Sequence, residues 1–355
     1  MKVQRMRAVG WKRVGLLGLA AALVAGCGIG TDGGGGEKQL TFVSYGKGTY
    51  QDGQENAWLK PFEEQNGVKV TLDGPSDNAK LQSMVEAGKV TWDVMDTDGF
   101  LPRQHCGTLL DTIDVGDLKD SFPPGTLSDC GVPAALFALE FMYNDKTYGD
   151  NPPTKLADFF DPVKYPGKRV IFGKDPTIGV LEAALMGDGV APDSLYPLDV
   201  ERAFGVYNRI RPTLTFAQTY AQQQQIMVDN QADMALVVSA RAYSVLNAGG
   251  TQWKPVWDQI PVTWDTLVIP KGSPNKDLAV QLIEFASQPE QAAKFAELSG
   301  AGAANTSAEP QLNDLQKQVD AWAPELEAKR HFINADWWTE HYNEVVEKWS
   351  KWQVS

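Results

Sequence analysis

The stretch PVTWDTLVIPKG, residues 261–272, decides the fold because it places a carboxylate inside a strand with two apolar faces. Alternate residues of a strand point to opposite faces, so Trp264 and Val268 share one face while Asp265 and Leu267 share the other. Such strands are typical of α/β proteins, whose sheets are covered on both sides. An unpaired carboxylate is unfavourable there, so Asp265 needs a cation, hydrogen-bond donors or water. An internal pair with a lysine or arginine of the chain is one answer.

The segment before this stretch alternates strands with helices. Strands are expected at 40–45, 68–74 and 92–99, and helices at 54–67 and 78–88, which predicts a parallel sheet with helices on its faces. Because ligands of such sheets lie at the carboxyl ends of the strands, several side chains are expected to meet at one edge. They are Tyr45, Tyr50, Asp96 and Asp98.

A second α/β unit begins at GKRVIF, residues 167–172, and ends with DMALVVSA, residues 233–240. The apolar strand at 135–145 leads into this unit and the strand at 260–269 leads out of it. The chain therefore passes twice between two α/β lobes, and these passages are the expected hinge strands. The lobes are expected to comprise residues 39–141 with 262–307, and residues 142–261 with 308–355.

The chain begins with MKVQRMRAVGWKRVGLLGLAAALVAGC, which has the order of a secretory signal: basic residues, a short apolar run, small residues and a cysteine. The apolar run is shorter than the roughly 20 residues that span a bilayer. We expect residues 1–26 to be removed and Cys27 to carry a diacylglycerol, as in bacterial lipoproteins. Residues 27–38 are Gly-rich and polar and are expected to form a tether. The mature protein is then lipid-anchored at the outer face of the cytoplasmic membrane.

Charge and cysteine content exclude several functions. The first 26 residues carry five of the 32 basic residues and none of the 45 acidic ones, which leaves 27 basic residues and a net charge of −18. This charge disfavours binding to nucleic acid. In an oxidising compartment Cys106 and Cys130 are expected to form a disulfide, the alternative being two separate buried thiols. The three histidines are isolated, so neither a metal site nor a cofactor is expected.

Four stretches resemble the bacterial extracellular solute-binding proteins of the spermidine/putrescine-binding type, which serve ABC importers. They are YGKGTYQDGQENAWLKPFEEQNGVKV, MYNDKTYGDNPPTKLADFFDPVKYPGKR, APDSLYPLDVERAF and DTLVIPKGSPNKDLAVQLIEFASQPEQAAKFAELSGAGAANTSA. The resemblance implies a type II periplasmic-binding fold that closes on its ligand by hinge motion. It also implies a monomer that performs no chemistry and delivers a small solute, here a cationic amine, to a membrane permease and its ATPase.

Binding residues are carried over from the family position by position. Polyamine binders hold ammonium groups with carboxylates and aromatic rings. Tyr45 and Tyr50 match the aromatic residues, Asp175 and Asp265 match carboxylates, and Asp98 stands where polyamine binders have hydroxyls or an aromatic. The opening loop departs from the family, because Lys47 and its neighbours replace an acid. The complete set of expected ligand contacts is Tyr45, Tyr50, Asp96, Asp98, Asp175, Gln218, Tyr220, Arg241, Trp264 and Asp265.

Arg241 is the sharpest departure from the polyamine binders. Its guanidinium could bind a ligand carboxylate or phosphate in bidentate fashion, which allows an amino-acid-like or phosphorylated ligand. Alternatively it pairs internally with Asp98, Asp175 or Asp265. A ligand that carries both charges would place its amine at Asp265 and its acid group at Arg241.

An enzyme is the less favoured function. The sequence has no G-x-S-x-G motif, and the positions of His105, His331 and His341 do not suggest a catalytic triad. The iron-binding relatives need adjacent tyrosines or a carboxylate–histidine set, which the sequence does not offer. The C-terminal segment has an aromatic stripe that we expect to pack on the body. Its members are Trp338, Tyr342, Val345, Val346, Trp349 and Trp352.

Overall fold

The computed structural model describes residues 38–355. The expected signal peptide, the lipidated Cys27 and nearly all of the tether lie outside these residues. The first strand begins at Lys38, one residue before the expected start of the fold. No helix within residues 38–355 has the length and apolar character needed to cross a membrane.

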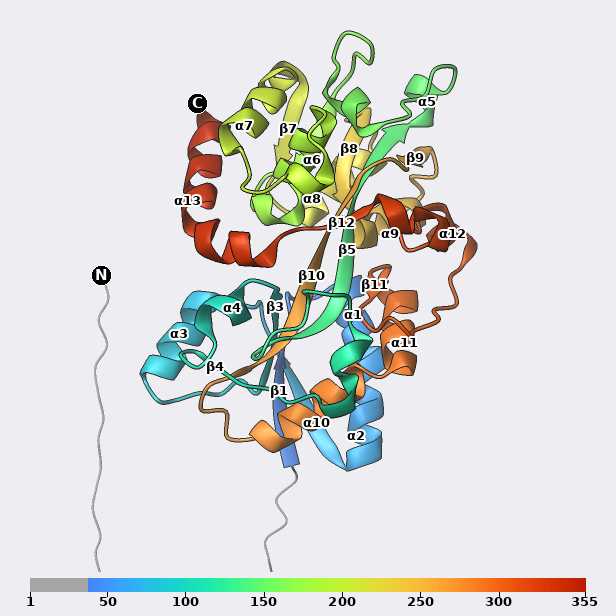
Figure 1. Ribbon diagram of the computed structural model, residues 1–355. Helices are drawn as coiled ribbons and strands as arrows, with labels where there is room; N and C mark the ends of the chain where they lie inside the picture. Colours follow the sequence, from blue (N-terminus) through green and yellow to red (C-terminus); the bar gives the residue numbers. More distant parts are fainter. Residues whose placement is uncertain (1–37) are drawn as a thin grey trace, which may run out of the picture. The chain divides into compact units, whose positions relative to one another are not determined.

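The described part of the chain forms one sheet of twelve strands (Figure 1). Its main path runs in the order β2 (Val68–Asp73), β1 (Lys38–Val43), β3 (Val94–Asp98), β10 (Ile260–Pro270), β5 (Val132–Asn144), β8 (Met234–Val238), β6 (Arg169–Phe172) and β7 (Leu214–Ala217). Four further strands pair with β5 or β10: β4 (Leu110–Asp111), β9 (Trp253–Val256), β11 (Gly302–Ala303) and β12 (Arg330–Phe332). The α/β class predicted from the sequence is confirmed.

The sheet is mixed: the parallel pairing predicted for the strands of the first unit is confirmed, whereas the crossing strands in the middle are antiparallel to their neighbours on the main path. Strand β1 is parallel to β2 and β3, and β6 is parallel to β7 and β8. In the middle, β10 is antiparallel to both β3 and β5, and β5 is antiparallel to β8. Strands β5 and β10 carry the chain across the sheet in opposite directions and are therefore antiparallel to each other, while the short β12 runs parallel to β10.

Strands β5 and β10 join the two halves of the fold. The first part of β5 pairs with β10, and residues Leu139–Tyr143 pair with β8 instead. Figure 1 shows both strands passing through the centre, with β1–β3 on one side and β6–β8 on the other. This is the two-lobed arrangement expected from the sequence, while the assignment of single residues to lobes stays a prediction.

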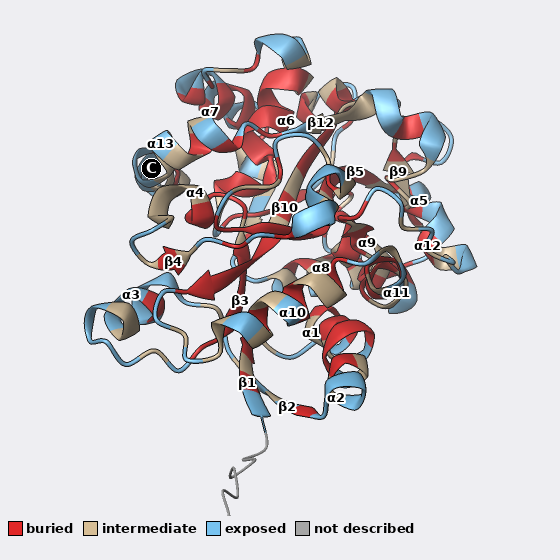
Figure 2. Ribbon diagram, turned by 60° about the horizontal axis from the view of Figure 1, so that its bottom comes forward, coloured by how far each residue is buried: buried red, intermediate tan, exposed pale blue. Residues whose placement is uncertain are grey.

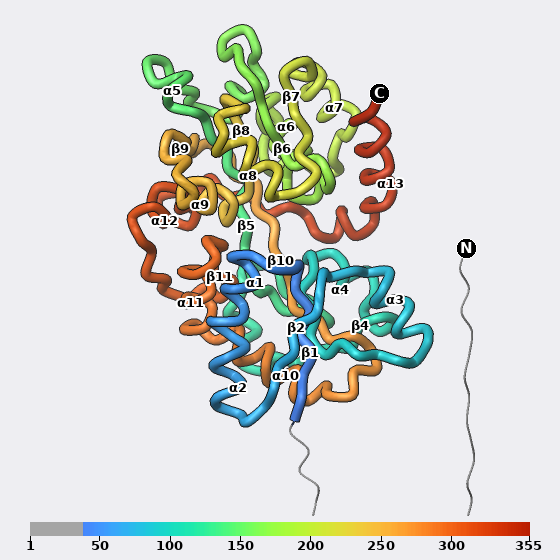
Figure 3. The backbone as a smooth tube through the Cα atoms, turned by 180° about the vertical axis from the view of Figure 1, so that it is seen from behind, coloured from blue at the N-terminus to red at the C-terminus, as the bar shows by residue number. Residues whose placement is uncertain are grey.

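Helices cover both halves of the sheet. They are α1 (Thr49–Gln54), a π-helical turn (Glu55–Leu59), α2 (Lys60–Asn66), α3 (Asn78–Glu86), α4 (Leu101–His105), α5 (Asp145–Tyr148), α6 (Val180–Gly187), α7 (Val200–Asn208), α8 (Tyr220–Val228), α9 (Ser239–Asn247), α10 (Lys276–Ala286), α11 (Pro289–Ser299), α12 (Asp314–Gln318) and α13 (Ala335–Val354). Figure 2 shows buried residues concentrated on the central strands and exposed residues on the outer helices. Helices α1 and α11 lie side by side (Figure 3), and the rings of Tyr50 and Phe295 meet edge to face at 5.3 Å.

The aromatic stripe of α13 is a packing face, as predicted. Trp349 is fully buried against Phe204 and Phe216, and Trp352 stacks on Phe204 at 4.9 Å. The beginning of α13 also touches α4 in the other half, where Gln104 Nε2 donates to the Thr339 carbonyl at 2.7 Å. The C-terminal helix therefore contacts elements that flank both sides of the crossing strands.

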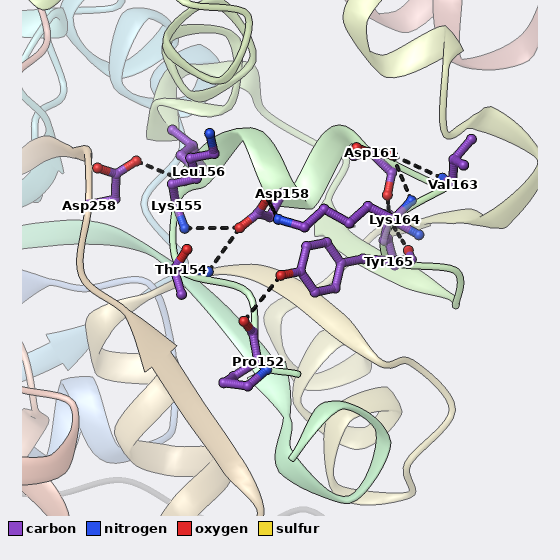
Figure 4. A network of polar contacts seen from close by, with 11 residues as sticks. Pro152, Thr154, Lys155, Leu156, Asp158, Asp161, Val163, Lys164, Tyr165 and Asp258 are labelled. Atoms are coloured by element: carbon purple, nitrogen blue, oxygen red, sulfur yellow. Dashed lines mark hydrogen bonds and ion pairs between the residues drawn. The ribbon is translucent and has the colours of Figure 1, made fainter. Parts of the chain in front are cut away.

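A polar network fixes the loop that follows β5 (Figure 4). The Asp158 carboxylate accepts the backbone N–H of Thr154 at 2.9 Å and the ammonium of Lys164 at 3.2 Å. Asp258, two residues before β10, accepts the backbone N–H of Leu156 at 2.9 Å. Because this last bond joins the loop after one crossing strand to the approach of the other, it ties the two crossings together at one end.

Cys106 and Cys130 lie at bonding distance, with their sulfur atoms 2.00 Å and their Cα atoms 5.4 Å apart. The bond joins the end of α4 to the turn before β5. Cross-links of this kind stabilise a fold by restricting the unfolded chain.

Glu140 on β5 is a buried acid without a partner. It is 1% exposed, and neither carboxyl oxygen has a hydrogen-bond partner within the described residues. Burial, with a smaller contribution from the negative charge of Asp320, raises the pKa of Glu140 well above its ordinary value. We infer that Glu140 is protonated in the folded protein at neutral pH, because an isolated buried carboxylate is strongly disfavoured.

Replacing Glu140 with Met should make folding stability less dependent on pH. Because the pKa of Glu140 is raised in the folded state, the free energy of unfolding of the wild type is highest below about pH 4, where Glu140 is protonated in both states. It decreases by up to about 1.4 kcal/mol per pH unit as the pH rises towards the folded pKa. Urea unfolding of Glu140→Met should therefore show a gain over the wild type that grows from pH 4 to pH 8. The exposed Glu64→Gln serves as the control, and a gain for Glu140→Met that is constant with pH would contradict this account.

Candidate functional site

The carboxylate of Asp265 meets two phenols. Tyr45, just beyond β1, donates its hydroxyl to Asp265 Oδ1 at 3.2 Å, and Tyr50 of α1 donates to Oδ2 at 3.1 Å. The ring of Phe137 from β5 lies 5.8 Å from that of Tyr50. Asp265 is thus surrounded by aromatic rings and hydroxyl donors, while no ion pair of Asp265 occurs within residues 38–355.

A β-bulge lies at Asp265. The pairing of β10 with β5 shifts between Asp265 and Thr266, where Asp265 faces Ala135 and Thr266 faces Pro133. Pro133 has no N–H to give to the ladder, and prolines inside sheets are confined to edges and bulges. The extra residue is Ala134 on β5, which lies next to Pro133 and opposite the step from Asp265 to Thr266.

Asp96 lies on β3 and is completely buried. Gln54 Nε2 donates to Asp96 Oδ2 at 2.5 Å, and Ser44 Oγ donates to Gln54 Oε1 at 2.5 Å. Asp96 Oδ1 has no hydrogen-bond partner within the described part of the chain. Burial raises the pKa of Asp96 to about 7. Burial also raises the pKa of Asp265, and the charge of Asp96 raises it further.

Asp98 and Asp175 come from opposite halves of the sheet. Asp98 accepts the backbone N–H groups of Phe100 and Leu101 at 2.8 and 2.9 Å, and Asp175 accepts Thr177 N and Oγ1 at 2.9 and 2.7 Å. Burial raises the pKa of both carboxyls in spite of these bonds, and the charge of Asp175 adds to the shift of Asp98. The two acids are therefore close enough to repel each other.

Arg241 and Tyr220 lie together in the second half. Tyr220, the first residue of α8, stacks on Phe172 with ring centroids 4.1 Å apart, and the Arg241 guanidinium carbon lies 5.2 Å from the Tyr220 centroid. Burial lowers the pKa of Arg241. Among residues 38–355 Arg241 forms no ion pair, so the predicted internal pair with Asp98, Asp175 or Asp265 is absent from this structure.

The phenol of Tyr220 is influenced by the charges of both Asp265 and Arg241. After burial, the charges of Asp175 and Asp265 raise the pKa of its phenol, and the charge of Arg241 lowers it. The Tyr220 hydroxyl is therefore within electrostatic reach of a carboxylate on one crossing strand and a guanidinium on α9. The structure brings Tyr45, Tyr50, Asp265, Tyr220 and Arg241 into one neighbourhood.

Two of the expected contacts have a different environment, since Trp264 is buried and Gln218 is exposed. Trp264 is 2% exposed and packs between Phe100 and Phe332, at ring distances of 6.3 and 6.2 Å. A ligand contact by Trp264 does not fit this position, because its side chain leaves β10 on the face opposite to that of Asp265. Gln218 is exposed, and its side-chain amide donates to the Phe216 carbonyl at 3.4 Å.

Sequence reasoning missed Gln54, Phe137, Phe172 and Tyr342. Gln54 follows Tyr50 by four residues on the same helical segment, so its position beside Tyr50 was readable from the helix period. Tyr342 was included in the packing stripe of α13, yet the charges of Asp175 and Asp98, together with burial, raise the pKa of its phenol. No local signal distinguishes Tyr342 from its packed neighbours.

The two lobes, the crossing strands and the acid–aromatic site together are those of a periplasmic-type substrate-binding protein. The family model described as "Bacterial extracellular solute-binding protein" matches residues 57–324. The chain belongs to this family. Within the part of the chain that the structure describes, no group of three or more acidic, histidine or cysteine side chains is arranged to hold a metal.

Three relatives show what the chain is similar to. It is 30% identical over 352 residues to the gamma-aminobutyric acid (GABA)-binding protein of Pseudomonas aeruginosa, with 96% of each chain covered. It is 23% identical over 294 residues to the spermidine/putrescine-binding periplasmic protein of Escherichia coli, with 79% of this chain and 82% of that one covered. A solved structure of a GABA receptor has a TM-score of 0.81 at 33% identity and covers 89% of this chain and 98% of that chain.

These comparisons confirm the predicted family and the role that comes with it. The protein is an exported solute-binding protein of the ABC-transporter type. The relatives are named as binding proteins rather than enzymes, which supports a transport role at the level of the family.

Gly99→Ala tests whether the Trp264 indole packs against Gly99, on the face of β10 opposite to that of Asp265. A Cβ atom at residue 99 would collide with the indole nitrogen of Trp264, so the buried indole would have to move. We expect the free energy of unfolding in urea to fall by about 1–3 kcal/mol. Gly205→Ala, on the exposed side of α7 with no atom within 4 Å of the new Cβ, should instead raise it by about 1 kcal/mol. Equal stability of Gly99→Ala and the wild type would contradict this position of Trp264.

Proposed function

We propose that this protein captures a small zwitterionic amine of the ω-amino-acid type, such as GABA, between its lobes and delivers it to an ABC permease and ATPase. The ammonium of the ligand binds at Asp265 and its carboxylate binds at Arg241. The observation that carries the proposal is that a carboxylate and a guanidinium both act on Tyr220. The charge of Asp265 raises the pKa of its phenol, the Arg241 guanidinium lies 5.2 Å from its ring centroid and lowers that pKa, and neither charged group is in an ion pair within the described residues.

The surroundings of Asp265 support an ammonium. An ammonium is stabilised by ring faces and by a charged acceptor, and both are present in Tyr45, Tyr50, Phe137 and the Asp265 carboxylate. The two phenol hydroxyls already hold the carboxylate in one orientation. A bound ammonium therefore meets an acceptor that needs little further ordering.

The surroundings of Arg241 support a carboxylate. The planar guanidinium matches a carboxylate with two parallel hydrogen bonds, and it is held against the Tyr220 ring at 5.2 Å. Two relatives are named for GABA, which carries an amine and a carboxylate. A second ammonium in place of the carboxylate would be repelled by Arg241.

A diamine such as putrescine is the second candidate. Burial raises the pKa of Asp98 and of Asp175, the charge of Asp175 adds to the shift of Asp98, and neither acid is in an ion pair within residues 38–355, so a second ammonium could bind near these carboxylates. One relative is named for spermidine and putrescine. In this case the second amine lies at Asp98 and Asp175 rather than at Arg241.

The location of the protein completes the proposal. A diacylglycerol on Cys27 would hold the protein at the outer face of the cytoplasmic membrane, as a monomer with its tether in residues 27–38. The Cys106–Cys130 bond would persist there, because the compartment is oxidising. Neither a cofactor nor a metal takes part in capture of the ligand.

Calorimetry with four compounds tests the proposal. We expect GABA to bind most tightly, because n-butylamine lacks the carboxylate, butyrate lacks the ammonium, and putrescine places a cation near Arg241. If putrescine binds and GABA does not, the zwitterion proposal fails in favour of the diamine. Binding of none of the four would exclude both candidates.

Substitutions at the two charged residues should separate the two ends of the ligand. Asp265→Asn should weaken GABA binding by about 2–5 kcal/mol, because the ammonium loses its charged acceptor. Arg241→Gln should weaken GABA by a similar amount and improve binding of putrescine. Arg209→Gln, which removes the same charge from an exposed pair with Asp188, is the control. Loss of folding in Asp265→Asn, seen by circular dichroism, would indicate a structural role instead.

A further inference from the structure

Asp96 is the least expected residue of the site. It is 0% exposed, it sits on β3 beside the return strand, and one of its two oxygens has no hydrogen-bond partner within residues 38–355. Its other oxygen is bound by Gln54, which Ser44 holds in turn. In the ladder of β3 and β10, Asp98 faces Asp265 and Asp96 faces Leu267, so Asp96 and Asp265 lie on the same face of the sheet as diagonal neighbours.

The groups that face this pair of acids supply no positive charge. Asp98 on β3 adds a further negative charge, and α1 and the loop before it present neutral groups, Tyr50, Gln54 and Tyr45. From the other half of the sheet, Tyr220 is the group that feels the charge of Asp265. Lys47 is exposed, and in the described part of the chain no lysine or arginine forms an ion pair with Asp96 or Asp265.

Two neighbouring carboxylates in such surroundings do not both ionise readily. Each charge loses hydration through burial and is opposed by the other, so one proton remains bound to the pair over a wide range of pH. Burial raises the pKa of both groups, that of Asp96 to about 7. Because the two titrations are linked, the proton belongs to the pair rather than to either residue.

We propose that Asp96 and Asp265 share one proton when no ligand is bound, and that the ammonium of the ligand expels this proton to solvent. The identity of the ammonium rests on the proposed function. The proton shared in the free protein is independent of that function. In the exchange one carboxyl O–H bond breaks, its proton passes to the buffer, and the already protonated ammonium takes its place. The charge of the site is conserved, and no electrons are transferred.

Asp96 is thus a positioning residue that adjusts the charge of the site to its ligand. The free protein avoids two uncompensated carboxylates, and the bound ammonium meets a pair with its full negative charge. Affinity for the amine must then depend on pH. Below about pH 7 the proton has to be displaced, so affinity falls by up to about tenfold for each pH unit; well above the pair's pKa no proton is released.

The first experiment uses the protein without ligand. The side-chain carboxyl carbons of aspartate are labelled with ¹³C, and their chemical shifts are followed by NMR from pH 4.5 to pH 8.5. We expect one resonance to titrate near pH 7 in the wild type and in Asp52→Asn, which removes an exposed acid from the same helix as Tyr50. That transition should be lost in Asp96→Asn. Full ionisation of every aspartate in the wild type by pH 5.5 would overturn the proposal without any variant.

The second experiment measures proton release with GABA as the probe. Calorimetry at pH 6 in two buffers of different ionisation enthalpy should give about one proton released per GABA, and close to none at pH 8.5. Asp96→Asn imitates the protonated carboxyl in shape, so it should bind GABA with little proton release and with a weaker dependence on pH. Asp52→Asn should match the wild type.

The two experiments separate the possible failures. A titrating pair together with no GABA binding would refute the proposed ligand and leave the shared proton standing. A titrating pair with GABA binding but no proton release would overturn the coupling between proton and ligand. If Asp96→Asn binds GABA with the same proton release as the wild type, Asp96 has no part in the exchange.

Discussion

The carboxylate of Asp265 is the constraint on which the rest of the site depends. A negative charge on a mostly buried strand is stable only when donors or cations surround it, and the two phenols that reach it come from the loop after β1 and from α1. The bulge of β5 at Ala134 lies opposite Asp265, and the charge of the neighbouring acid Asp96 raises the pKa of Asp265 after burial has done so. The surroundings of the Asp265 side chain are therefore set by strand pairing, by the position of the loop after β1 and by neighbouring charges.

The same strand that carries Asp265 also links the two halves of the sheet. Because β10 and β5 pair with each other and with different neighbours on either side, a relative motion of the halves must be absorbed within these strands and the loops that flank them. Asp265 lies on one of these strands. Arg241, on α9 directly after β8, lies in the other half from Tyr45 and Tyr50.

Much of this arrangement could be predicted from residue patterns. Alternation along residues 261–272 indicated that Asp265 and Trp264 face opposite sides, and helix periodicity predicted the packed face of α13. The antiparallel middle of the sheet could not be predicted, because strand direction there depends on pairing between segments more than 100 residues apart, such as β5 and β10. Gln54 was missed because a neutral amide gives no charge signal, and Tyr342 because its surroundings come from two distant carboxylates.

Asp265 and Arg241 carry opposite charges without pairing with each other, and for this reason a resemblance to polyamine binders does not determine the identity of the ligand. Under the proposed function, the carboxylate end with its phenols keeps the chemistry of an amine site, whereas Arg241 makes the other end one that repels cations. Internal neutralisation of Arg241 would have removed this difference, but no carboxylate pairs with it in the part of the chain that the structure describes. Under the same proposal, substitution of Arg241 alone changes selectivity, because the residues proposed to bind the ammonium, Asp265 with Tyr45 and Tyr50, stay unchanged.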